Sequence, residues 1–216
     1  MGLSGGVDSA VVASLAKETV GRKRLLALIL PCHSQAQDLE DAKMVAKKLK
    51  IKTRILDLSK IYDNLIKILP KTGNLAKSNL KPRLRMLILY YFANKLNYLV
   101  SGTGNKSEIM VGYFTKHGDG ATDILPIGDL LKKQVRQLAR ELGIPTRIIN
   151  KTPTAGLWPG QTDEREMGIT YPELDEILER LEKKNGQMLS KEKVNKVKAM
   201  INRSGHKRQG PKICYI

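Results

Sequence analysis

The chain has 216 residues, a length that suits one globular domain with a sizeable core. Hydrophobic residues make up 41% of it and charged residues 27%, which excludes a disordered or fibrous chain. No apolar run approaches the ~18 residues that cross a bilayer, and the N-terminal sequence does not have the pattern of a signal peptide. The two cysteines, Cys32 and Cys214, form no CxxC pair and no metal-ligand cluster. We therefore expect a cytoplasmic protein without a membrane partner.

The charge balance is strongly basic, because 38 Lys and Arg against 21 Asp and Glu give a net charge of +17. Such a charge attracts polyanions, including RNA and phosphorylated small molecules. A lysine-rich composition spread over solvated surfaces explains it equally well. The basic residues are dispersed along the chain, and no aromatic residues are interleaved with the cluster in the C-terminal quarter. The charge alone therefore does not identify a partner.

Hydrophobic periodicity predicts an alternation of helices and strands. Helices are expected over residues 9–20, 36–50, 61–68, 79–96 and 129–142, strands over residues 25–30, 53–58 and 98–101, and a loop over residues 70–79. The run at 25–30 is entirely apolar, which is typical of a strand buried on both faces. This pattern predicts an α/β fold, a doubly wound parallel sheet with flanking helices. Ligands of such sheets bind at the carboxyl ends of the strands.

The segment Ser4-Gly-Gly-Val-Asp-Ser9 runs directly into a predicted helix. Its glycines allow a tight turn whose N–H groups face an anion, and the helix N-terminus adds a partial positive charge. An ordinary glycine-rich turn capped by Ser9 is the alternative. The segment is not a Walker A loop, and the nearest match, Gly102–Ser107, has Asn105 in place of the second glycine. Only three residues precede Ser4, so we expect either a shortened first strand or a polypeptide that begins further upstream.

The loop resembles the phosphate loop of the N-type ATP pyrophosphatases, and later segments resemble ammonia-dependent NAD synthetases. These segments are Lys81–Met86, Gly102–Glu108, Gly112–Ile124, Lys151–Trp158, Gln161–Glu164, Gly168–Tyr171 and Ser204–Arg208. Their order and spacing follow the family along nearly the whole chain. The resemblance implies an adenine nucleotide alpha hydrolase-like, Rossmann-like fold. It also implies a single domain over residues 1–216 that is truncated at its N-terminus and carries no glutaminase domain.

The resemblance further implies an activity, the ATP-dependent amidation of deamido-NAD to NAD by ammonia. In this reaction the nicotinate carboxylate attacks the α-phosphate of ATP, which gives an acyl-adenylate and pyrophosphate. Ammonia then displaces AMP. Neither step requires a protein nucleophile, so positioning and electrostatic stabilisation would supply most of the acceleration.

The family motifs also assign residues to the site. The implied ATP-binding residues are Gly2, Leu3, Ser4, Gly5, Gly6, Val7, Asp8, Ser9, Thr103, Lys132 and Thr154; the implied deamido-NAD-binding residues are Arg83, Lys116, Asp123, His206 and Lys207. Asp8 and Glu108 are the implied Mg²⁺ ligands, since a carboxylate pair with ATP phosphates suits that ion. For Glu108 the alternative is a glutamate favoured by a helix dipole, and for the lysines it is a solvent-facing charge.

Family members form homodimers, so a homodimer is expected, with ATP, deamido-NAD and ammonia as its small-molecule partners and no nucleic acid. One alternative is a tRNA-modifying enzyme of the same superfamily, which the charge of +17 favours and the lack of CxxC pairs opposes. The other is a truncated nucleotide-binding chain with little activity, because a loop without its supporting strand would be loosely held.

Overall fold

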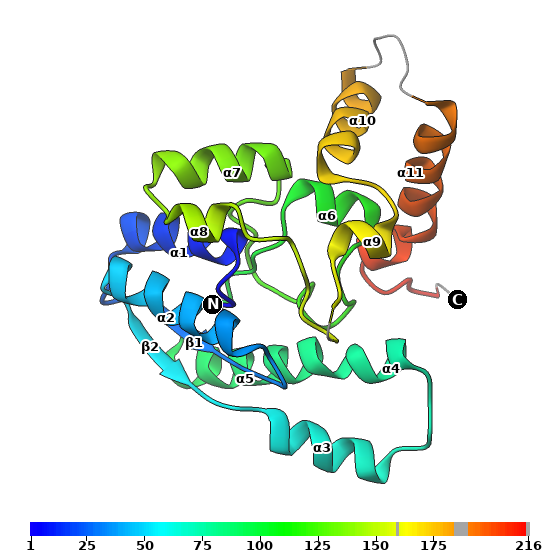
Figure 1. Cartoon of the computed structure of the whole chain (residues 1–216). Coiled ribbons are helices and arrows are strands. Elements are labelled where there is room, and N and C mark those ends of the chain that lie inside the picture. Colours follow the sequence, from blue (N-terminus) through cyan, green and yellow to red (C-terminus); the bar gives the residue numbers. More distant parts are fainter. Residues whose placement is uncertain (159, 184–189, 215–216) are drawn as a thin grey trace.

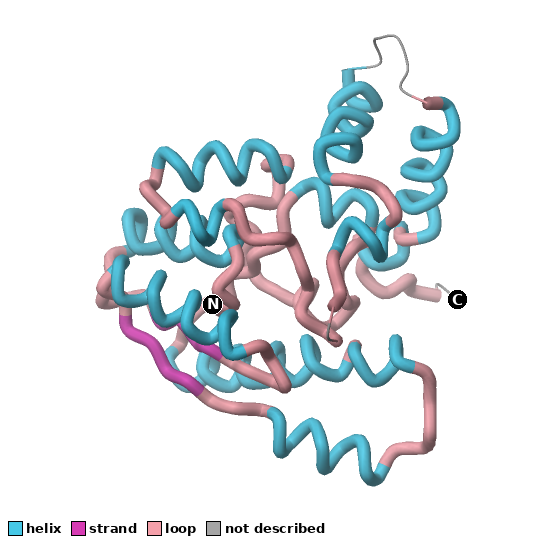
Figure 2. The backbone as a smooth tube through the Cα atoms, in the orientation of Figure 1, coloured by secondary structure: helices cyan, strands magenta, loops and turns pink. Residues whose placement is uncertain are grey.

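The fold is built on a small parallel sheet, seen in a computed structural model that describes residues 1–158, 160–183 and 190–214. Strand β1 (Leu26–Ile29) pairs in parallel with β2 (Lys52–Ile55). On the other edge of β1, residues 1–3 add a parallel segment, in which Leu3 N–H donates to Leu28 O and Leu28 N–H donates to Met1 O. The two named strands are the short arrows of Figure 1 and the magenta segments of Figure 2. The predicted parallel sheet is confirmed.

The sequence and the structure differ at the third predicted strand, residues 98–101. Only Ser101 forms a β-bridge there, to Ile124, and this bridge is parallel. The expected strand at 53–58 begins one residue earlier and ends at Ile55. Strand β1 is buried throughout, as predicted, whereas β2 is largely exposed because it lies at the edge of the sheet.

Helices make up most of the described chain. They are α1 (Val7–Val20), α2 (Ala36–Leu49), α3 (Ser59–Ile68), α4 (Asn74–Ser78), α5 (Leu80–Leu96), α6 (Lys106–Val111), α7 (Lys132–Glu141), α8 (Thr146–Ile149), α9 (Asp163–Met167), α10 (Tyr171–Lys183) and α11 (Lys191–Arg203), followed by the 3₁₀ turn Gly205–Lys207. The five predicted helices are confirmed, with ends that shift by a few residues. The predicted loop at 70–79 is wrong in part, because α4 lies within it.

Alternate residues of β1 pack on opposite sides, which is why the sheet is covered on both faces. Ala27 and Ile29 belong to the cluster formed with α1, α2, α7 and α8. Leu28 belongs to a second cluster, which includes Ile88 and Phe92 of α5. Figure 1 shows α5 running along the side of the sheet away from α1. This two-sided packing is what the apolar run at 25–30 requires.

A third apolar cluster joins α6, α10 and α11 around the fully buried Leu174 and Val197. In Figure 1 the α10–α11 pair projects from the main layer, with α6 and α9 at its base. Helix α10 packs against α7, and α7 packs against α1. The third cluster is thereby connected to the helix that follows the glycine-rich loop.

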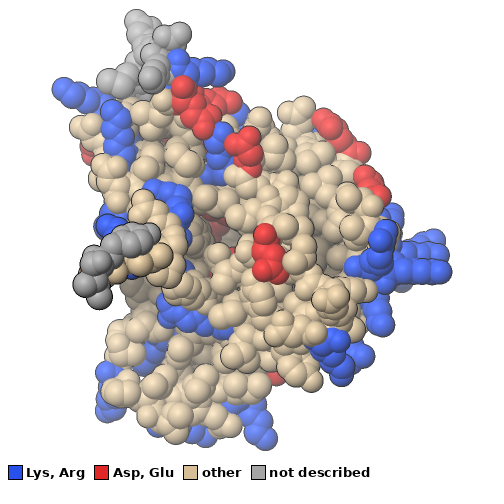
Figure 3. Space-filling model, turned by 180° about the vertical axis from the view of Figure 1, so that it is seen from behind, with Lys and Arg blue, Asp and Glu red and all other residues tan. Residues whose placement is uncertain are grey.

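Within the described residues, no helix is long and apolar enough to cross a membrane. The face in Figure 3 carries its Lys and Arg side chains mainly around its rim, with much of the centre free of them. On this face the basic residues do not form one continuous track.

Candidate active site

The glycine-rich loop connects residues 1–3 to α1 at the carboxyl end of the parallel sheet. Gly5 has φ +82°, and a Cβ there would lie 2.5 Å from the carbonyl oxygen of Asp38 on α2. Only glycine fits this close approach. The Ser9 hydroxyl donates to Gly6 O and lies 3.1 Å from the Ser4 hydroxyl. The N-cap of α1 is therefore Gly6, with no side-chain cap, and not Ser9. Uncapped N–H groups at a helix N-terminus favour an anion.

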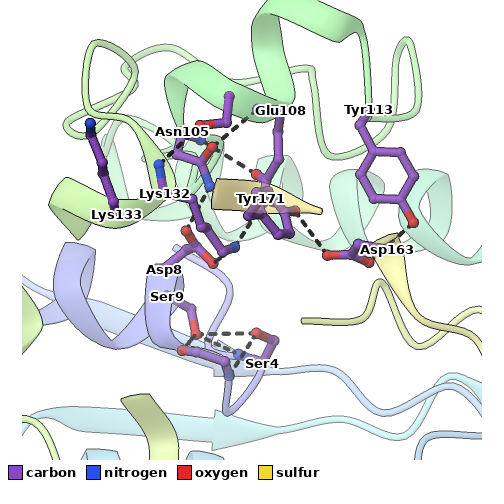
Figure 4. A network of polar contacts seen from close by, with 12 residues as sticks. Ser4, Asp8, Ser9, Asn105, Glu108, Tyr113, Lys132, Lys133, Asp163 and Tyr171 are labelled. Carbon is purple, nitrogen blue, oxygen red and sulfur yellow. Dashed lines mark hydrogen bonds and ion pairs between the residues drawn. The ribbon is translucent and has the colours of Figure 1, made fainter. Parts of the chain in front are cut away.

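Two carboxylates face each other beside this loop, and a lysine ammonium lies between them (Figure 4). The Nζ of Lys132 is 2.7 Å from Asp8 Oδ2 and 3.0 Å from Glu108 Oε1. The Lys132 side chain is only 3% exposed, so it is not the solvent-facing lysine that the alternative interpretation required. Burial disfavours its charge, but the two carboxylates outweigh that effect and raise the pKa of Lys132. The ammonium is therefore charged at neutral pH.

Asn105 fixes both carboxylates, and sequence reasoning missed it. Its side-chain Nδ2 donates to Asp8 Oδ1 at 2.8 Å, while its Oδ1 accepts from Glu108 N. Asn105 N–H donates in turn to Glu108 Oε2, which completes a capping box at the start of α6. An Asn followed three residues later by Glu is a helix-start pattern, so that signal was available. Glu108 therefore serves both as a helix-start residue and as a member of the carboxylate pair.

Behind the carboxylate pair lies Tyr171, which is 1% exposed. Its hydroxyl lies 3.0 Å from both Glu108 Oε1 and Asp163 Oδ2, and its ring lies 4.7 Å from the Lys132 ammonium. Tyr113 donates to Asp163 on the other side. Burial raises the pKa of Asp163, and burial together with the nearby Asp8 carboxylate raises the pKa of Glu108 to about 7. A chain of polar contacts from α10, α9 and the turn after α6 thus lies behind the carboxylate pair.

Asp8, Glu108 and Lys132 border a cavity of about 720 Å³. Nearly all of the residues that the family motifs assign line it: Gly2, Leu3, Ser4, Gly6, Val7, Asp8, Ser9, Arg83, Thr103, Glu108, Lys116, Lys132, Thr154, His206 and Lys207. Gly5 lies behind the loop against α2 and does not line the cavity.

The cationic side of the cavity is built from three distant segments. Arg83 on α5 donates to Lys116 O, and the Lys116 ammonium donates to His206 O at 2.7 Å. The Lys207 ammonium donates to Gly112 O and Phe114 O, so it holds the turn after α6 in place. The structure brings the four predicted residues together, although Lys207 already donates two hydrogen bonds to the backbone.

Asp123 is the one assigned substrate residue that the structure leaves outside the cavity lining. It is exposed, and its carboxylate accepts from the Tyr90 hydroxyl and from Val100 N–H. Its role in binding deamido-NAD stays a prediction.

A second charged cluster includes the α2 residues that contact the glycine-rich loop, and sequence reasoning missed it too. The Lys151 ammonium lies 2.7 Å from Asp38 Oδ1 and 2.7 Å from Asp41 Oδ2. Asp38 and Asp41 are the α2 residues against which Gly5 packs. Lys151 therefore ties the segment that carries Thr154 to α2, against which the loop packs, and nothing in the spacing of these residues could have revealed it.

The glycine-rich turn leads into a helix at the carboxyl end of a parallel sheet, and a carboxylate pair lies beside it at the wall of a large cavity. These features define an α/β protein that binds nucleotide phosphates. The sequence profile of the NAD synthase family matches residues 1–211. The chain belongs to the NAD synthase family.

Individual relatives agree with this assignment. An NH₃-dependent NAD⁺ synthetase of Archaeoglobus fulgidus is 51% identical over 218 residues, which cover 100% of this chain and 87% of the relative. Among solved structures, an NMN synthetase from Francisella tularensis is 42% identical with a TM-score of 0.91, covering 100% of this chain and 88% of the other. An NH₃-dependent NAD synthetase from Campylobacter jejuni is 32% identical with a TM-score of 0.85, and the match covers 99% of this chain and 88% of the other.

Proposed function

We propose that this chain is a ligase that converts deamido-NAD to NAD⁺ with ATP and ammonia, through an acyl-adenylate. The observation that carries the proposal is the meeting of the Ser4–Ser9 loop with Asp8 and Glu108 at one cavity, in a chain of this family. A tRNA-modifying activity is not favoured, because the family match runs over nearly the whole chain.

The loop would bind the phosphates of ATP, and the carboxylate pair would hold the metal ion that accompanies them. The backbone N–H groups at the start of α1 and the Ser4 hydroxyl face the cavity and would bind phosphate oxygens. Asp8 and Glu108 would hold Mg²⁺: two carboxylates that already converge on one cation fit an ion that takes one or two protein carboxylates plus phosphates and water. Such an ion, when bound, neutralises charge on the departing pyrophosphate.

The reaction then requires the chain to hold two polyanionic nucleotides together. A nicotinate carboxylate oxygen forms a bond to the α-phosphorus of ATP as the bond to the β-phosphate oxygen breaks and pyrophosphate leaves. The ammonia nitrogen next attacks the acyl carbon, AMP leaves with the oxygen that came from the carboxylate, and the surplus ammonia proton passes to solvent. Lys132 and the loop stabilise the phosphates in the first step, while Thr103 and Thr154 offer hydroxyls at the cavity wall.

The cationic side of the cavity suits the acceptor nucleotide. Arg83, Lys116, His206 and Lys207 lie together there and would contact the phosphates and ribose of deamido-NAD. Asp123 joins them as a proposed contact from outside this lining.

A second candidate acceptor is the mononucleotide, nicotinate mononucleotide, because the structure at TM-score 0.91 is an NMN synthetase. We expect deamido-NAD to be the better substrate by at least ~10-fold in kcat/KM, since its adenylate half adds binding energy that the transition state can use. Steady-state rates of NAD⁺ or NMN formation with each acceptor, at fixed ATP and ammonium, test this. A higher kcat/KM for the mononucleotide would contradict deamido-NAD as the preferred acceptor and would identify the mononucleotide as the substrate.

We further propose that the active form is a homodimer that joins through α5. Leu87 and Tyr91 lie one turn apart on α5 and are 60% and 59% exposed, and the nearby Leu99 is 68% exposed. The hydrogen bond from Tyr90 to Asp123 places Asp123 beside this apolar surface. A second copy of the chain packed here would cover the apolar side chains and enclose Asp123.

Leu87→Glu is expected to weaken the dimer by at least ~10-fold, because it places a charge in the centre of an apolar contact. Val20→Glu on α1, which lies on the other face of the sheet, is the matched control and should leave association unchanged. Sedimentation velocity over a concentration series measures both. A wild-type chain that remains monomeric, or a Leu87→Glu chain that dimerises as well as the wild type, contradicts the proposed interface.

A further inference from the structure

The proposed metal position already holds a positive charge that belongs to the chain. The Lys132 ammonium contacts the same two carboxylate oxygens, Asp8 Oδ2 and Glu108 Oε1, that point toward each other across the site. The remaining oxygens of both carboxylates, Asp8 Oδ1 and Glu108 Oε2, accept hydrogen bonds from Asn105. Asn105 therefore fixes the carboxylates from one side, and the ammonium closes the space between them (Figure 4).

We propose that Lys132 acts as a replaceable cation: it occupies the metal position in the nucleotide-free protein and gives it up only when Mg²⁺ arrives together with ATP. The inference rests on the proposed function, which assigns Asp8 and Glu108 to the metal. It adds that this metal site is closed to free divalent ions. Lys132 thereby becomes a residue that determines the order of binding.

Electrostatics favours Lys132 between the carboxylates when the site holds no nucleotide, and at the phosphates when ATP and the metal are bound. Without the ammonium, two carboxylates would face each other in a largely buried site, which is costly for like charges. A metal ion that enters alone must displace the ammonium and leave it unpaired beside the Tyr171 ring. When ATP enters too, the displaced ammonium gains phosphate oxygens as new partners, because Lys132 also lines the cavity that the loop faces.

The local structure allows the side chain to move without unfolding its surroundings. The backbone N–H of Lys132 donates to the Ser107 hydroxyl, and α7 begins at this residue. On the Lys132 side these contacts involve only backbone atoms, so they hold the start of α7 while the four-carbon side chain changes partners. The next residue, Lys133, points away from the site and pairs with Glu179 on α10 (Figure 4).

The test is Mn²⁺ binding to the full chain, measured by equilibrium dialysis with and without ATP and with no acceptor present. Free ATP is equal on both sides of the membrane, so only the excess Mn²⁺ on the protein side counts as bound. The wild type should bind Mn²⁺ weakly alone and tightly with ATP. Lys132→Met should bind Mn²⁺ without ATP at least ~10-fold more tightly than the wild type, because one positive charge has been removed from between two carboxylates. Lys133→Met is the matched control and should behave as the wild type.

A second measurement covers the case in which Lys132→Met is poorly folded. Mn²⁺ should then raise its melting temperature, or restore its circular dichroism, by more than it does for the wild type, since the ion replaces the lost cation. Wild-type protein that binds Mn²⁺ equally well with and without ATP overturns the inference. So does a Lys132→Met chain that neither binds Mn²⁺ more tightly nor is stabilised by it. Wild-type protein that binds no Mn²⁺ even with ATP would show that the proposed metal ligands are wrong. That result differs from Mn²⁺ binding that does not depend on ATP, which overturns the role of Lys132 alone.

Discussion

Asp8→Asn and Glu108→Gln should each lower pyrophosphate release by at least ~10³-fold, because each removes a charge that would help to hold the metal at the departing phosphates. Both variants should fold. The new amides are close in size to the carboxylates, and Lys132 retains the other carboxylate as a partner. In Asp8→Asn, the amide oxygen can still accept the hydrogen bond from Asn105. Pyrophosphate release in the presence of deamido-NAD and far-ultraviolet circular dichroism measure the two parts of this prediction.

The matched control is Asp129→Asn, which removes an exposed carboxylate that pairs with Lys106 outside the cavity. It should release pyrophosphate at the wild-type rate. A wild-type rate in either Asp8→Asn or Glu108→Gln would refute the assignment of the metal ligands.

Replacement of Asn105 should also lower activity strongly, because this side chain positions Asp8 and Glu108 without contacting the substrates itself. Asn105→Ala removes the N-cap of α6 and the donor to Asp8, so we expect a loss of about 1–2 kcal/mol in the free energy of unfolding. We also expect kcat to fall by ~100-fold, since small displacements of reacting groups are costly. Urea unfolding and steady-state kinetics provide the two measurements.

Asn105→Asp separates the two contributions of this side chain. An aspartate can still accept from Glu108 N–H, so the helix cap should be retained, whereas the new charge at this buried position beside Asp8 should lower the free energy of unfolding. It cannot donate to Asp8 and adds a third carboxylate to the pair, so activity should fall as far as in Asn105→Ala. If Asn105→Asp is as active as the wild type, Asn105 does no more than cap the helix.

The sequence could predict those parts of the fold and site that depend on local pattern. The apolar run at 25–30 indicated a strand covered on both faces, and the family motifs indicated residues that line one cavity. Helix α4 was not predicted, because a five-residue helix is too short to show a hydrophobic period. The strand at 98–101 was wrong in extent because strand formation depends on a partner, and only Ser101 forms a bridge there.

The contacts that hold the site together depend on residues far apart in the chain. Lys132 was expected to bind phosphate, but its pairing with Asp8, 124 positions away, follows only from the packing of α7 against α1. The same is true of Lys151 and Asp38, which are 113 positions apart. No local pattern marks such pairs, whereas the capping box at Asn105 could have been recognised from spacing.

The proposed reaction requires a bond between the acceptor's carboxylate oxygen and the α-phosphorus of ATP. It is tested most directly by supplying deamido-NAD with heavy oxygen in its nicotinate carboxylate, together with Mg²⁺, ATP and ammonium, and weighing the products by mass spectrometry. We expect one heavy oxygen in AMP for each NAD⁺ formed, none in pyrophosphate, and no NAD⁺ without ammonium. Unlabelled AMP, or ADP and labelled phosphate as the products, would contradict it.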